Sequence, residues 1–404
     1  MSRIHGICSK SLLGSGIALA MFLPLGTAQA QTLSALYTFT GGADGNNPST
    51  GLVADSSGNL YGTTFNGGAH GDGVVFQVTP GGAETVLYSF SGSPDGANPA
   101  AGLIRLHNGT SYGTTENGGA SGGGTVFMLS KTGVETVLHS FSGGPDGFNP
   151  FGALIRDSAG NLYGTTGDGG TGGCGVGCGT VFKVSAAGVE TVLYSFTGGS
   201  DGVDPVGSLI RDSSGNLYGT TETGGAHGNG TVFELSPAGA ETILYSFAGT
   251  PDGSGPEAAL LRKGANFYGT TNVGGVDDAG TVFNLKRGTE KVLHSFTESP
   301  DGSSPQGALI EDAAMAGTFY GTTYGSGSSA YGTVFSVTTS GSENVLASFN
   351  GSNGPGPGAT GAFPNGGLLQ DSSGNVYGTA TDGGSIFVNG GWVTGAGTVF
   401  KLVP

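Results

Sequence analysis

The stretch that decides the fold runs from Ser213 to Phe247 and reads SSGNLYGTTETGGAHGNGTVFELSPAGAETILYSF. Its core is a Tyr-Gly-Thr-Thr, a glycine-rich loop and a Gly-Thr-Val-Phe, and versions of this core recur along the chain. The repeat tyrosines are spaced by 51, 51, 55, 50, 52 and 57 residues and are Tyr61, Tyr112, Tyr163, Tyr218, Tyr268, Tyr320 and Tyr377. Seven copies at a period of about fifty residues predict a repeat architecture, and this period suits a propeller blade.

Each unit contains four short runs with the character of strands. In the fourth unit we expect them at residues 208–212, 217–221, 231–235 and 242–247, because such runs are rich in β-branched and aromatic residues and are bounded by Gly, Asn, Asp and Pro. The glycine of Tyr-Gly-Thr-Thr is expected to allow a close approach of neighbouring backbone. No segment after residue 30 has helical periodicity long enough to predict a helix. The sequence therefore predicts an all-β protein, a seven-bladed β-propeller of four-stranded blades.

The two ends of the repeat region are complementary. Residues 34–39 match a fourth strand that has no blade of its own, and residues 398–402 match a third strand that has no successor. We expect the N-terminal strand to complete the last blade, which would close the ring and remove two exposed sheet edges. The order of strands resembles that of NHL-type propellers, which implies that the first strand lines the channel and the fourth is outermost.

The first thirty residues differ from the rest. Arg3 and Lys10 precede an apolar run at residues 12–25, and small residues follow as far as Ala30. This pattern predicts a secretory signal peptide at residues 1–30, cleaved after Ala30, and a propeller domain at residues 31–404. No later apolar segment approaches membrane length, so we expect no membrane span and an exported protein, periplasmic or extracellular.

Charge and cysteine content agree with export. The chain has 13 Lys and Arg against 29 Asp and Glu, a formal net charge of −16, which disfavours nucleic acid and anionic lipid as partners. Cys174 and Cys178 form a Cys-Gly-Val-Gly-Cys loop, which predicts a disulfide in an oxidising compartment. Zinc is the weaker alternative, because no His or further Cys lies near them in the sequence.

The repeated Gly-Asn-Leu-Tyr-Gly-Thr-Thr, with Gly-Gly-Ala and Gly-Thr-Val-Phe downstream, resembles the bacterial "choice-of-anchor tandem repeat GloVer-containing" proteins. The resemblance covers essentially the whole chain after residue 30. It implies exported bacterial proteins with assorted C-terminal anchors, and no established reaction or ligand. The sequence given stops at Pro404, directly after an expected strand, so we expect a periplasmic or released protein rather than an anchored one.

Alternate connections in an antiparallel blade lie on opposite faces. The Asp-x-x-Gly-Asn and Ala-Gly-x-Glu turns should share one face, and the Asp-Gly-x-x-Pro and glycine-rich loops the other. Variable loops on a rigid scaffold usually carry binding, so we expect the ligand on the second face.

The seventh unit departs most from the pattern. It has insertions at residues 353–362 and 382–396, and the second begins at Asp382 and contains Phe387 and Trp392. Aromatic residues on long loops commonly hold ligands, including sugars and peptides, which makes these three residues candidates for ligand binding. The open alternative is that Trp392 covers the seam where the ring closes.

Four arginines occupy one position of the first strand: Arg105, Arg156, Arg211 and Arg262. They could form an arc that binds an anion, with Arg156 and Arg211 as its central candidates. The favoured interpretation pairs them with acids in adjoining turns, such as Asp157 and Asp212, so that they brace neighbouring blades.

The Asp-Gly-x-x-Pro aspartates are Asp44, Asp95, Asp146, Asp201, Asp252 and Asp301. A turn in which Asp caps its own backbone explains them better than a calcium site, which needs denser oxygen ligands. The repeat tyrosines and phenylalanines are expected in the core rather than in a binding platform.

No catalytic residue, metal-ligand set or cofactor motif stands out. The favoured hypothesis is a secreted, monomeric binding or interaction module with a glycan or a protein as ligand. A propeller lyase or hydrolase acting on carbohydrate or small molecules, and a structural surface or matrix protein, are the alternatives.

Overall fold

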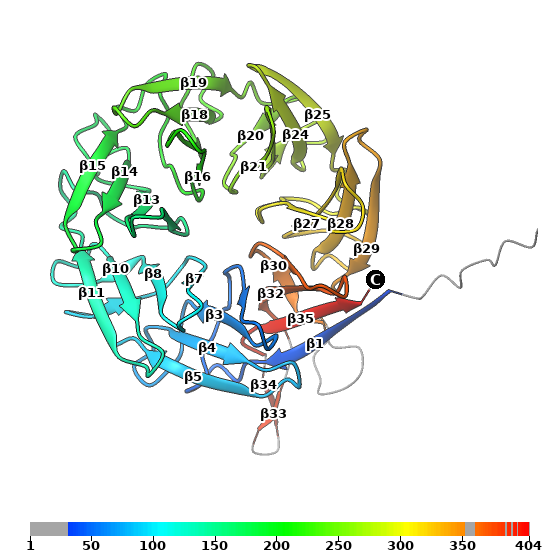
Figure 1. The fold of residues 1–404 in the computed structure, drawn as a ribbon. Coiled ribbons are helices and arrows are strands. Elements are labelled where there is room, and N and C mark those ends of the chain that lie inside the picture. The colour runs from blue at the N-terminus through cyan, green and yellow to red at the C-terminus, as the bar shows by residue number, and fades with distance from the viewer. Residues whose placement is uncertain (1–30, 352–359, 384–385, 389–390, 394, 404) are drawn as a thin grey trace, which may run out of the picture. The chain divides into compact units, whose positions relative to one another are not determined.

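The computed structural model describes residues 31–351, 360–383, 386–388, 391–393 and 395–403. These residues form strands and loops only, and the strands are grouped in seven antiparallel blades around a central channel (Figure 1). The predicted seven-bladed, all-β propeller is confirmed. Among the residues described, the chain forms no helix with the length and apolar character needed to cross a bilayer.

The innermost strand of each blade is short. These strands are β2 (Val53–Ala54), β7 (Ile104–Arg105), β12 (Ile155–Arg156), β16 (Ile210–Arg211), β21 (Leu261–Lys263), β26 (Ile310–Glu311) and β31 (Leu369–Gln370). The second strands carry Tyr-Gly-Thr-Thr, or Tyr-Gly-Thr-Ala in the seventh blade. They are β3 (Leu60–Thr64), β8 (Ser111–Thr115), β13 (Leu162–Thr166), β17 (Leu217–Thr221), β22 (Asn266–Thr271), β27 (Thr318–Thr323) and β32 (Val376–Asp382).

The two outer positions follow the same order. The third strands are β4 (Val74–Val78), β10 (Thr125–Leu129), β14 (Thr180–Val184), β18 (Thr231–Leu235), β24 (Thr281–Lys286), β28 (Thr333–Thr338) and β35 (Thr398–Val403). The outermost strands are β5 (Glu84–Ser89), β11 (Glu135–Ser140), β15 (Glu190–Ser195), β19 (Glu241–Ser246), β25 (Thr289–Ser295), β29 (Glu343–Ser348) and β1 (Thr32–Thr38).

Six short strands lie in the loops. They are β6 (Gly96–Ala97), which pairs with β9 (Asn117–Gly118); β20 (Gly253–Ser254), which pairs with β23 (Val273–Gly274); and β33 (Ile386–Val388), which pairs with β34 (Gly391–Val393). A further strand, β30 (Ala362–Pro364), pairs with β32 of the seventh blade.

In the fourth unit the expected second and third strands coincide with β17 and β18, whereas the outer two differ slightly. The first is shorter than expected, because only Ile210 and Arg211 pair with the second strand. The fourth strand begins one residue earlier, at Glu241, and ends at Ser246. Phe247 lies beyond the strand, and its N–H donates to the carbonyl of Gly230 at 3.0 Å.

The ring closes as predicted. β1 pairs antiparallel with β35, with Ala35 opposite Phe400, and Figure 1 shows the first strand (dark blue) beside the last (red). The seventh blade therefore takes its outer strand from the beginning of the domain, and its third strand has a partner on both sides.

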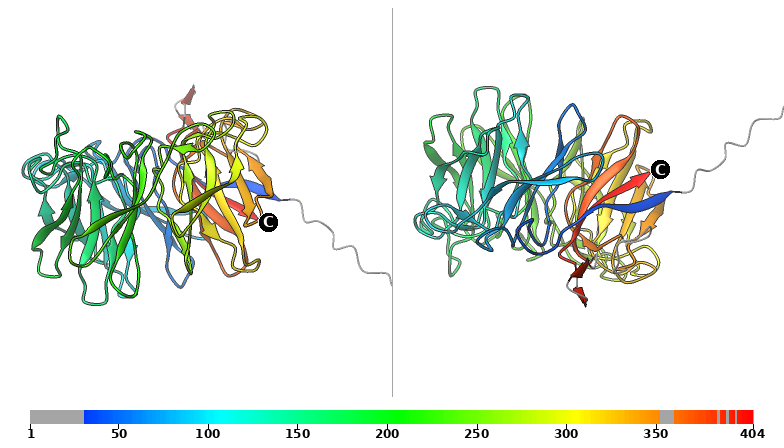
Figure 2. Two further views of the ribbon diagram at one scale, coloured as in Figure 1. Left: turned by 90° about the horizontal axis from the view of Figure 1, so that it is seen from above. Right: turned by 90° about the horizontal axis from the view of Figure 1, so that it is seen from below.

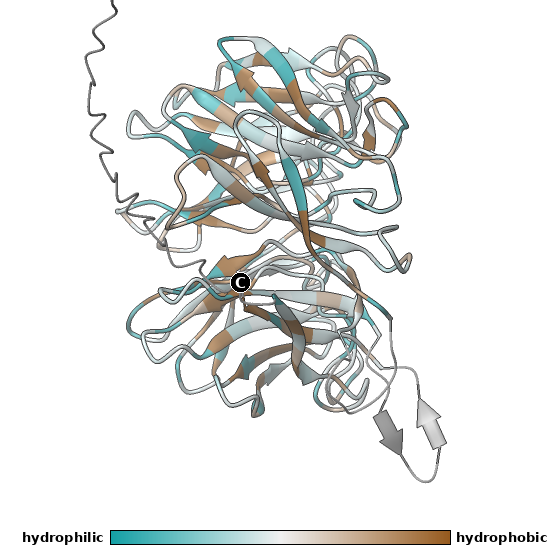
Figure 3. Ribbon diagram, turned by 90° about the vertical axis from the view of Figure 1, so that its right-hand side faces the viewer, coloured by the Kyte–Doolittle hydropathy of each residue, from teal (hydrophilic) through white to brown (hydrophobic). Residues whose placement is uncertain are grey.

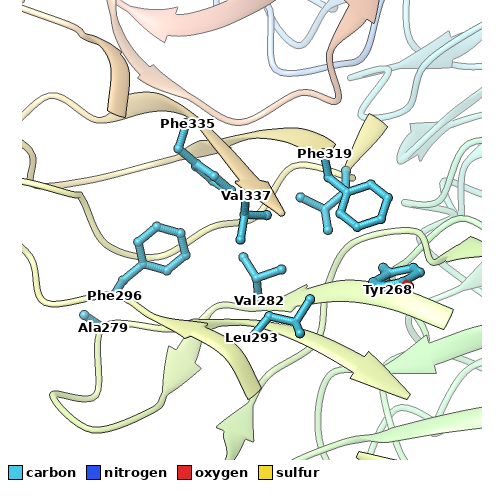
Figure 4. Close-up of a cluster of buried hydrophobic side chains, with 9 residues drawn as sticks. Tyr268, Ala279, Val282, Leu293, Phe296, Phe319, Phe335 and Val337 are labelled. Carbon is cyan, nitrogen blue, oxygen red and sulfur yellow. The ribbon is translucent and has the colours of Figure 1, made fainter. Parts of the chain in front are cut away.

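The hydrophobic core lies between blades. The phenylalanine after each outermost strand packs edge-to-face on the Phe of Thr-Val-Phe in the next blade, or its counterpart in the first, with ring centroids 5.0–5.2 Å apart. The pairs are Phe39–Phe76, Phe90–Phe127, Phe141–Phe182, Phe196–Phe233, Phe247–Phe283, Phe296–Phe335 and Phe349–Phe400, and all fourteen side chains are fully buried. Figure 4 shows one such cluster, and Figure 3 shows hydrophobic residues recurring along the strands. One blade alone cannot bury these rings.

The glycine of Tyr-Gly-Thr-Thr is required by a side chain, not by the neighbouring backbone as expected from the sequence. Gly219 lies opposite Phe233 in the β17–β18 pair. A Cβ atom on Gly219 would lie 2.7 Å from Cζ of Phe233 and 3.0 Å from Cδ2 of Leu209. The glycine thus leaves room for the ring that joins the third and fourth blades.

Replacing Gly219 by alanine should therefore destabilise the protein. We expect Gly219→Ala to lower the free energy of unfolding by about 1–3 kcal/mol, the usual effect of forcing an extra carbon into a packed core. Chemical denaturation measures it. Gly81→Ala is the matched control, because its Cβ would meet only Thr79 Oγ1, at 3.9 Å. Equal stability of the two variants would contradict this account.

Candidate functional site

The Asp-Gly-x-x-Pro loops and the glycine-rich loops lie on one face of the ring, where they are hydrogen-bonded to each other. Bridges join Asn46 to Asn66, Phe148 to Asp168 and Val203 to Thr223, and the β6–β9 and β20–β23 pairs are equivalent. Figure 2 shows loops projecting from both faces of the ring. We call the face with these interlocked loops the loop face, and the face with the Asp-x-x-Gly-Asn turns the turn face.

The repeat aspartates of the loop face close their own loops. Oδ2 of Asp252 accepts hydrogen bonds from the N–H of Ala248 at 2.8 Å and from the hydroxyl of Tyr245 at 2.9 Å. The other five make the corresponding backbone contact, and a histidine replaces the tyrosine beside Asp146 and Asp301. This geometry supports the turn interpretation of these residues. Among the described residues, no three or more His, Cys, Asp or Glu are grouped so as to hold a metal ion.

The seventh unit has the same loop in altered form, which the sequence reasoning missed. Thr360 occupies the position of the aspartate, and its Oγ1 accepts the hydrogen bond from the N–H of Asn350 at 3.1 Å. In the outermost strand that precedes this loop, β29 of the sixth blade, Ala347 replaces the tyrosine, so the tyrosine and the aspartate are lost together. The signal was present in the sequence, since Thr-Gly-Ala-Phe-Pro at 360–364 matches Asp-Gly-x-x-Pro.

A cleft of about 450 Å³ occupies the central channel. It is lined by the residues that follow the proline of the Asp-Gly-x-x-Pro loops, mostly Gly and Ala. The aromatic rings of Phe65 and Phe151 also line it. Ser49, Gln306 and Asn365 add polar groups, and Glu257 is the one acid among the described residues that line it.

A series of interacting carboxylates leads away from Glu257 along the loop face, over the fifth to the third blades. Burial and then the neighbouring Glu222 raise the pKa of Glu257 to about 7, although Asn272 donates a hydrogen bond to it at 2.7 Å. Burial and then Asp204 raise the pKa of Glu222, and burial and then Asp168 raise that of Asp204. The loop face therefore presents an electronegative arc that disfavours anionic ligands. Sequence reasoning missed this arc, whose members are brought together only by the ring.

Asp382 lines a second cleft, of about 520 Å³, on the seventh blade. Its Oδ1 accepts a hydrogen bond from Nδ2 of Asn47 at 3.1 Å, which joins the seventh blade to the first. The other two candidates of this unit are in the β33–β34 pair, where Phe387 is opposite Trp392. Residues 353–359 of the first predicted insertion, and 384, 385, 389, 390 and 394 of the second, lie outside the described residues.

Phe363 also lines this cleft and has an unusual backbone conformation. Its φ is +60°, whereas most residues with positive φ in the chain are glycine, asparagine or other small residues. A bulky residue in this region costs about 1–3 kcal/mol. The ring of Phe363 stacks on Tyr324, with centroids 5.1 Å apart and an interplanar angle of 27°. Such a pair stabilises the folded state by about 0.5–1.5 kcal/mol, which covers only the lower part of the range for the strain.

The arginines lie at the turn face, and three of the four contact the preceding blade. Arg262 is 3.4 Å from Oδ2 of Asp212 and lies over the ring of Tyr218 at 4.9 Å, both on the preceding blade. Arg105 and Arg211 lie over the equivalent tyrosines, Tyr61 and Tyr163, at 3.7 and 5.8 Å.

Arg262 is thus paired with an acid of an adjoining turn, as the bracing interpretation supposed, whereas Arg105 and Arg211 contact the preceding blade through tyrosine rings. Arg156 and Arg211 end β12 and β16 where the Asp-x-x-Gly-Asn turns begin, and Asp382 ends β32 on the loop face. The structure therefore does not bring these three candidates together.

The predicted disulfide between Cys174 and Cys178 is present, in the glycine-rich loop of the third blade. Cys178 is fully buried, and both sulfur atoms lie close to Gly198 in the loop that leads to the fourth blade. The bridge therefore closes this loop where it packs against the junction of the third and fourth blades.

A family model for the Gloeobacter/Verrucomicrobia repeat matches residues 24–198 and again residues 172–393. The chain belongs to this family. The resemblance to GloVer-containing proteins is thereby confirmed. No curated protein matches the sequence significantly.

Solved structures share the fold of this family member at low identity. The extracellular domain of a candidate one-component system from B. thetaiotaomicron aligns with a TM-score of 0.59 at 10% identity, over 92% of this chain and 40% of that one. This chain thus spans about two fifths of that structure. A candidate 6-phosphogluconolactonase from Bacteroides uniformis aligns with a TM-score of 0.51 at 15% identity, over 85% of this chain and 98% of that one. At such identities the similarity establishes the fold alone.

The outer rim of the propeller carries a glutamate at the start of six outermost strands. Burial, and then an aspartate of the loop face, raise the pKa of each from 4.5 to about 7. The six are Glu84, Glu135, Glu190, Glu241, Glu290 and Glu343, and each has a buried Oε1 without a hydrogen-bond partner among the described residues. The folded state therefore favours the protonated, uncharged form of these glutamates.

Stability should consequently rise on mild acidification. The folded state binds more protons than the unfolded chain between pH 4.5 and 7, so the stabilisation is complete below pH 4.5 and is lost as the pH rises through 7. We expect a higher Tm at pH 5 than at pH 8, measured by calorimetry. The variant with Glu190→Gln, Glu241→Gln and Glu290→Gln should show a weaker dependence, because glutamine does not titrate. A Tm that is flat or falls from pH 8 to pH 5 would refute this assignment.

Proposed function

We propose that this protein is an exported β-propeller binding module whose ligand docks on the loop face. In this proposal residues 1–30 are the secretory signal, and the domain at residues 31–404 works as a monomer in the periplasm or outside the cell. The disulfide supports export, because such bridges persist in oxidising compartments.

The position of the clefts carries the proposal. The clefts of about 450 and 520 Å³ are both lined by loop-face residues, whereas the turn face has a cleft of about 170 Å³, beside Gly58 and Asp371. Sites for small ligands commonly have volumes of about 300–1,000 Å³, are largely apolar and contain a few polar groups. The channel cleft fits this description in volume and lining, and the cleft of about 520 Å³ fits it in volume and is more polar.

The lining of the channel favours recognition over catalysis. An enzyme at the channel would need titratable groups that converge on a reacting atom. The described lining offers glycine, alanine, two phenylalanines and neutral polar groups, with Glu257 as its single acid. This composition supports a shelf for binding, and the lyase or hydrolase hypothesis is the second choice.

A thermal-shift screen of the exported protein tests the proposal. The panel contains neutral oligosaccharides, peptides and divalent cations, and at a concentration of 100 Kd a ligand adds about 2.7 kcal/mol to stability. We expect at least one ligand to raise Tm and to be recovered unchanged by mass spectrometry.

Variants on the two faces then locate the site. Phe151→Ala, Glu257→Gln or Phe363→Asn on the loop face should reduce the shift, and Arg156→Ala and Arg211→Ala on the turn face should preserve it. Loss of the shift only in the arginine variants would move the site to the turn face and refute the proposal. Conversion of the ligand to product would favour the enzyme hypothesis instead.

A further inference from the structure

The residue before the proline of each Asp-Gly-x-x-Pro loop has a positive φ. In six units it is small or polar, with φ between 56° and 64°: Asn47, Asn98, Asn149, Asp204, Gly255 and Ser304. Asparagine, aspartate and glycine adopt this conformation more readily than other residues. In the seventh unit the same position holds Phe363, the one bulky side chain of the set.

Asparagine at this position links neighbouring blades. Nδ2 of Asn98 donates to the carbonyl of Phe65 at 3.0 Å, and Nδ2 of Asn149 donates to Oε1 of Glu116 at 3.3 Å. Phe65 and Glu116 both follow the Tyr-Gly-Thr-Thr of the preceding blade, and Tyr324 is their equivalent before the seventh blade. Phe363 cannot donate such a bond and stacks on Tyr324 instead. An aromatic pair thus replaces the polar link at this junction.

The strained ring lies at the edge of the larger cleft. Phe363 and Tyr331 line the cleft of about 520 Å³, whereas Tyr324 is not among its lining residues. The ring centroids of Phe363 and Tyr331 are 5.9 Å apart, with an interplanar angle of 65°, and Tyr331 is 37% exposed. Because strain of this kind is concentrated at functional sites, the position of Phe363 indicates a role in the cleft rather than in the core.

The cleft also has a polar part, which comes mainly from the loop that enters the first blade. Asn47 is fixed between Asp382, to which it donates, and Asn66, which donates to its Oδ1 at 3.1 Å. Asn46 lines the cleft and has an amide that offers both donors and an acceptor, and the exposed carboxylate of Asp382 is an acceptor. Aromatic rings and paired donors and acceptors therefore meet in one cleft.

This combination fits the chemistry of a sugar ring. The hydroxyl groups of a pyranose donate and accept at once, and its C–H face can pack on the electron-rich face of an aromatic ring. An anionic ligand would meet Asp382 on a chain with a net charge of −16. A cation would leave the asparagine donors without partners. We infer that this cleft, at the junction of the sixth, seventh and first blades, binds an uncharged saccharide. The inference names the ligand class for the proposed binding module and rests on that function.

Phe363→Asn is the decisive variant, because asparagine is the residue at the same position of the first three units. Isothermal titration calorimetry measures binding of cellotriose, maltotriose, xylotriose and N,N′,N″-triacetylchitotriose to the full exported protein. At least one should bind, with affinity reduced roughly tenfold or more in Phe363→Asn, as expected when an aromatic anchor is lost. The Tm of this variant should equal or exceed that of the wild type, since the strain is relieved. Tyr331→Ala should also weaken binding, and Ser304→Asn, the matched control in the sixth unit, should not.

Three outcomes would overturn the inference. They are unchanged saccharide affinity in Phe363→Asn, a fall of several degrees in its Tm, and no binding by any saccharide of the panel. If affinity falls in Phe151→Ala but not in Phe363→Asn, the loop-face binding function stands and the cleft assignment fails. If saccharide affinity falls only in Arg156→Ala or Arg211→Ala, both the loop-face binding function and the cleft assignment fail.

Discussion

The edge-to-face contact between phenylalanines of successive blades is the interaction on which the rest of this structure depends. Each ring after an outermost strand is fully buried against the third strand of the next blade, and Phe39 and Phe349 continue the series across the closure. Since β1 belongs to the seventh blade, no blade is left with an uncovered face. The contact explains why glycine precedes Thr-Thr in every second strand, or Thr-Ala in the seventh: a side chain there would occupy the space of the ring.

A scaffold joined in this way leaves the loop face free to vary. The repeat aspartate, with a tyrosine or a histidine of the preceding strand beside it, holds six loops in one shape. In the loop of the seventh unit Thr360 replaces the aspartate and keeps only the backbone contact. This unit also carries the insertions and Phe363, which stacks on Tyr324 of the sixth blade. The regular units thus supply rigidity, and the loops of the irregular unit line the larger cleft.

The turn face and the loop face differ in their charged residues. On the turn face, arginines lie over tyrosines of the preceding blade, and Arg262 meets the carboxylate of Asp212. On the loop face, Glu222, Asp204 and Glu257 lie near other carboxylates and have raised pKa values, caused first by burial and then by these neighbours. Three arginines of the turn face therefore contact the preceding blade, whereas the carboxylates with raised pKa values lie on the loop face, with Glu257 at the channel.

The sequence by itself determined the features that are local or periodic. The spacing of the tyrosines predicted seven blades, alternation of apolar runs and turn residues predicted the strands, and two cysteines separated by three residues predicted their own bridge. The complementary ends predicted the closure. Tertiary structure decided which residues from different units meet. The stacking of Phe363 on Tyr324, the link between Asn47 and Asp382, and the proximity of Glu222 to Glu257 join positions of different units that are 39, 335 and 35 residues apart. A repeat pattern records what the units share. Contacts that arise because one unit differs from its neighbours depend on how the ring places the units side by side, which no local pattern encodes.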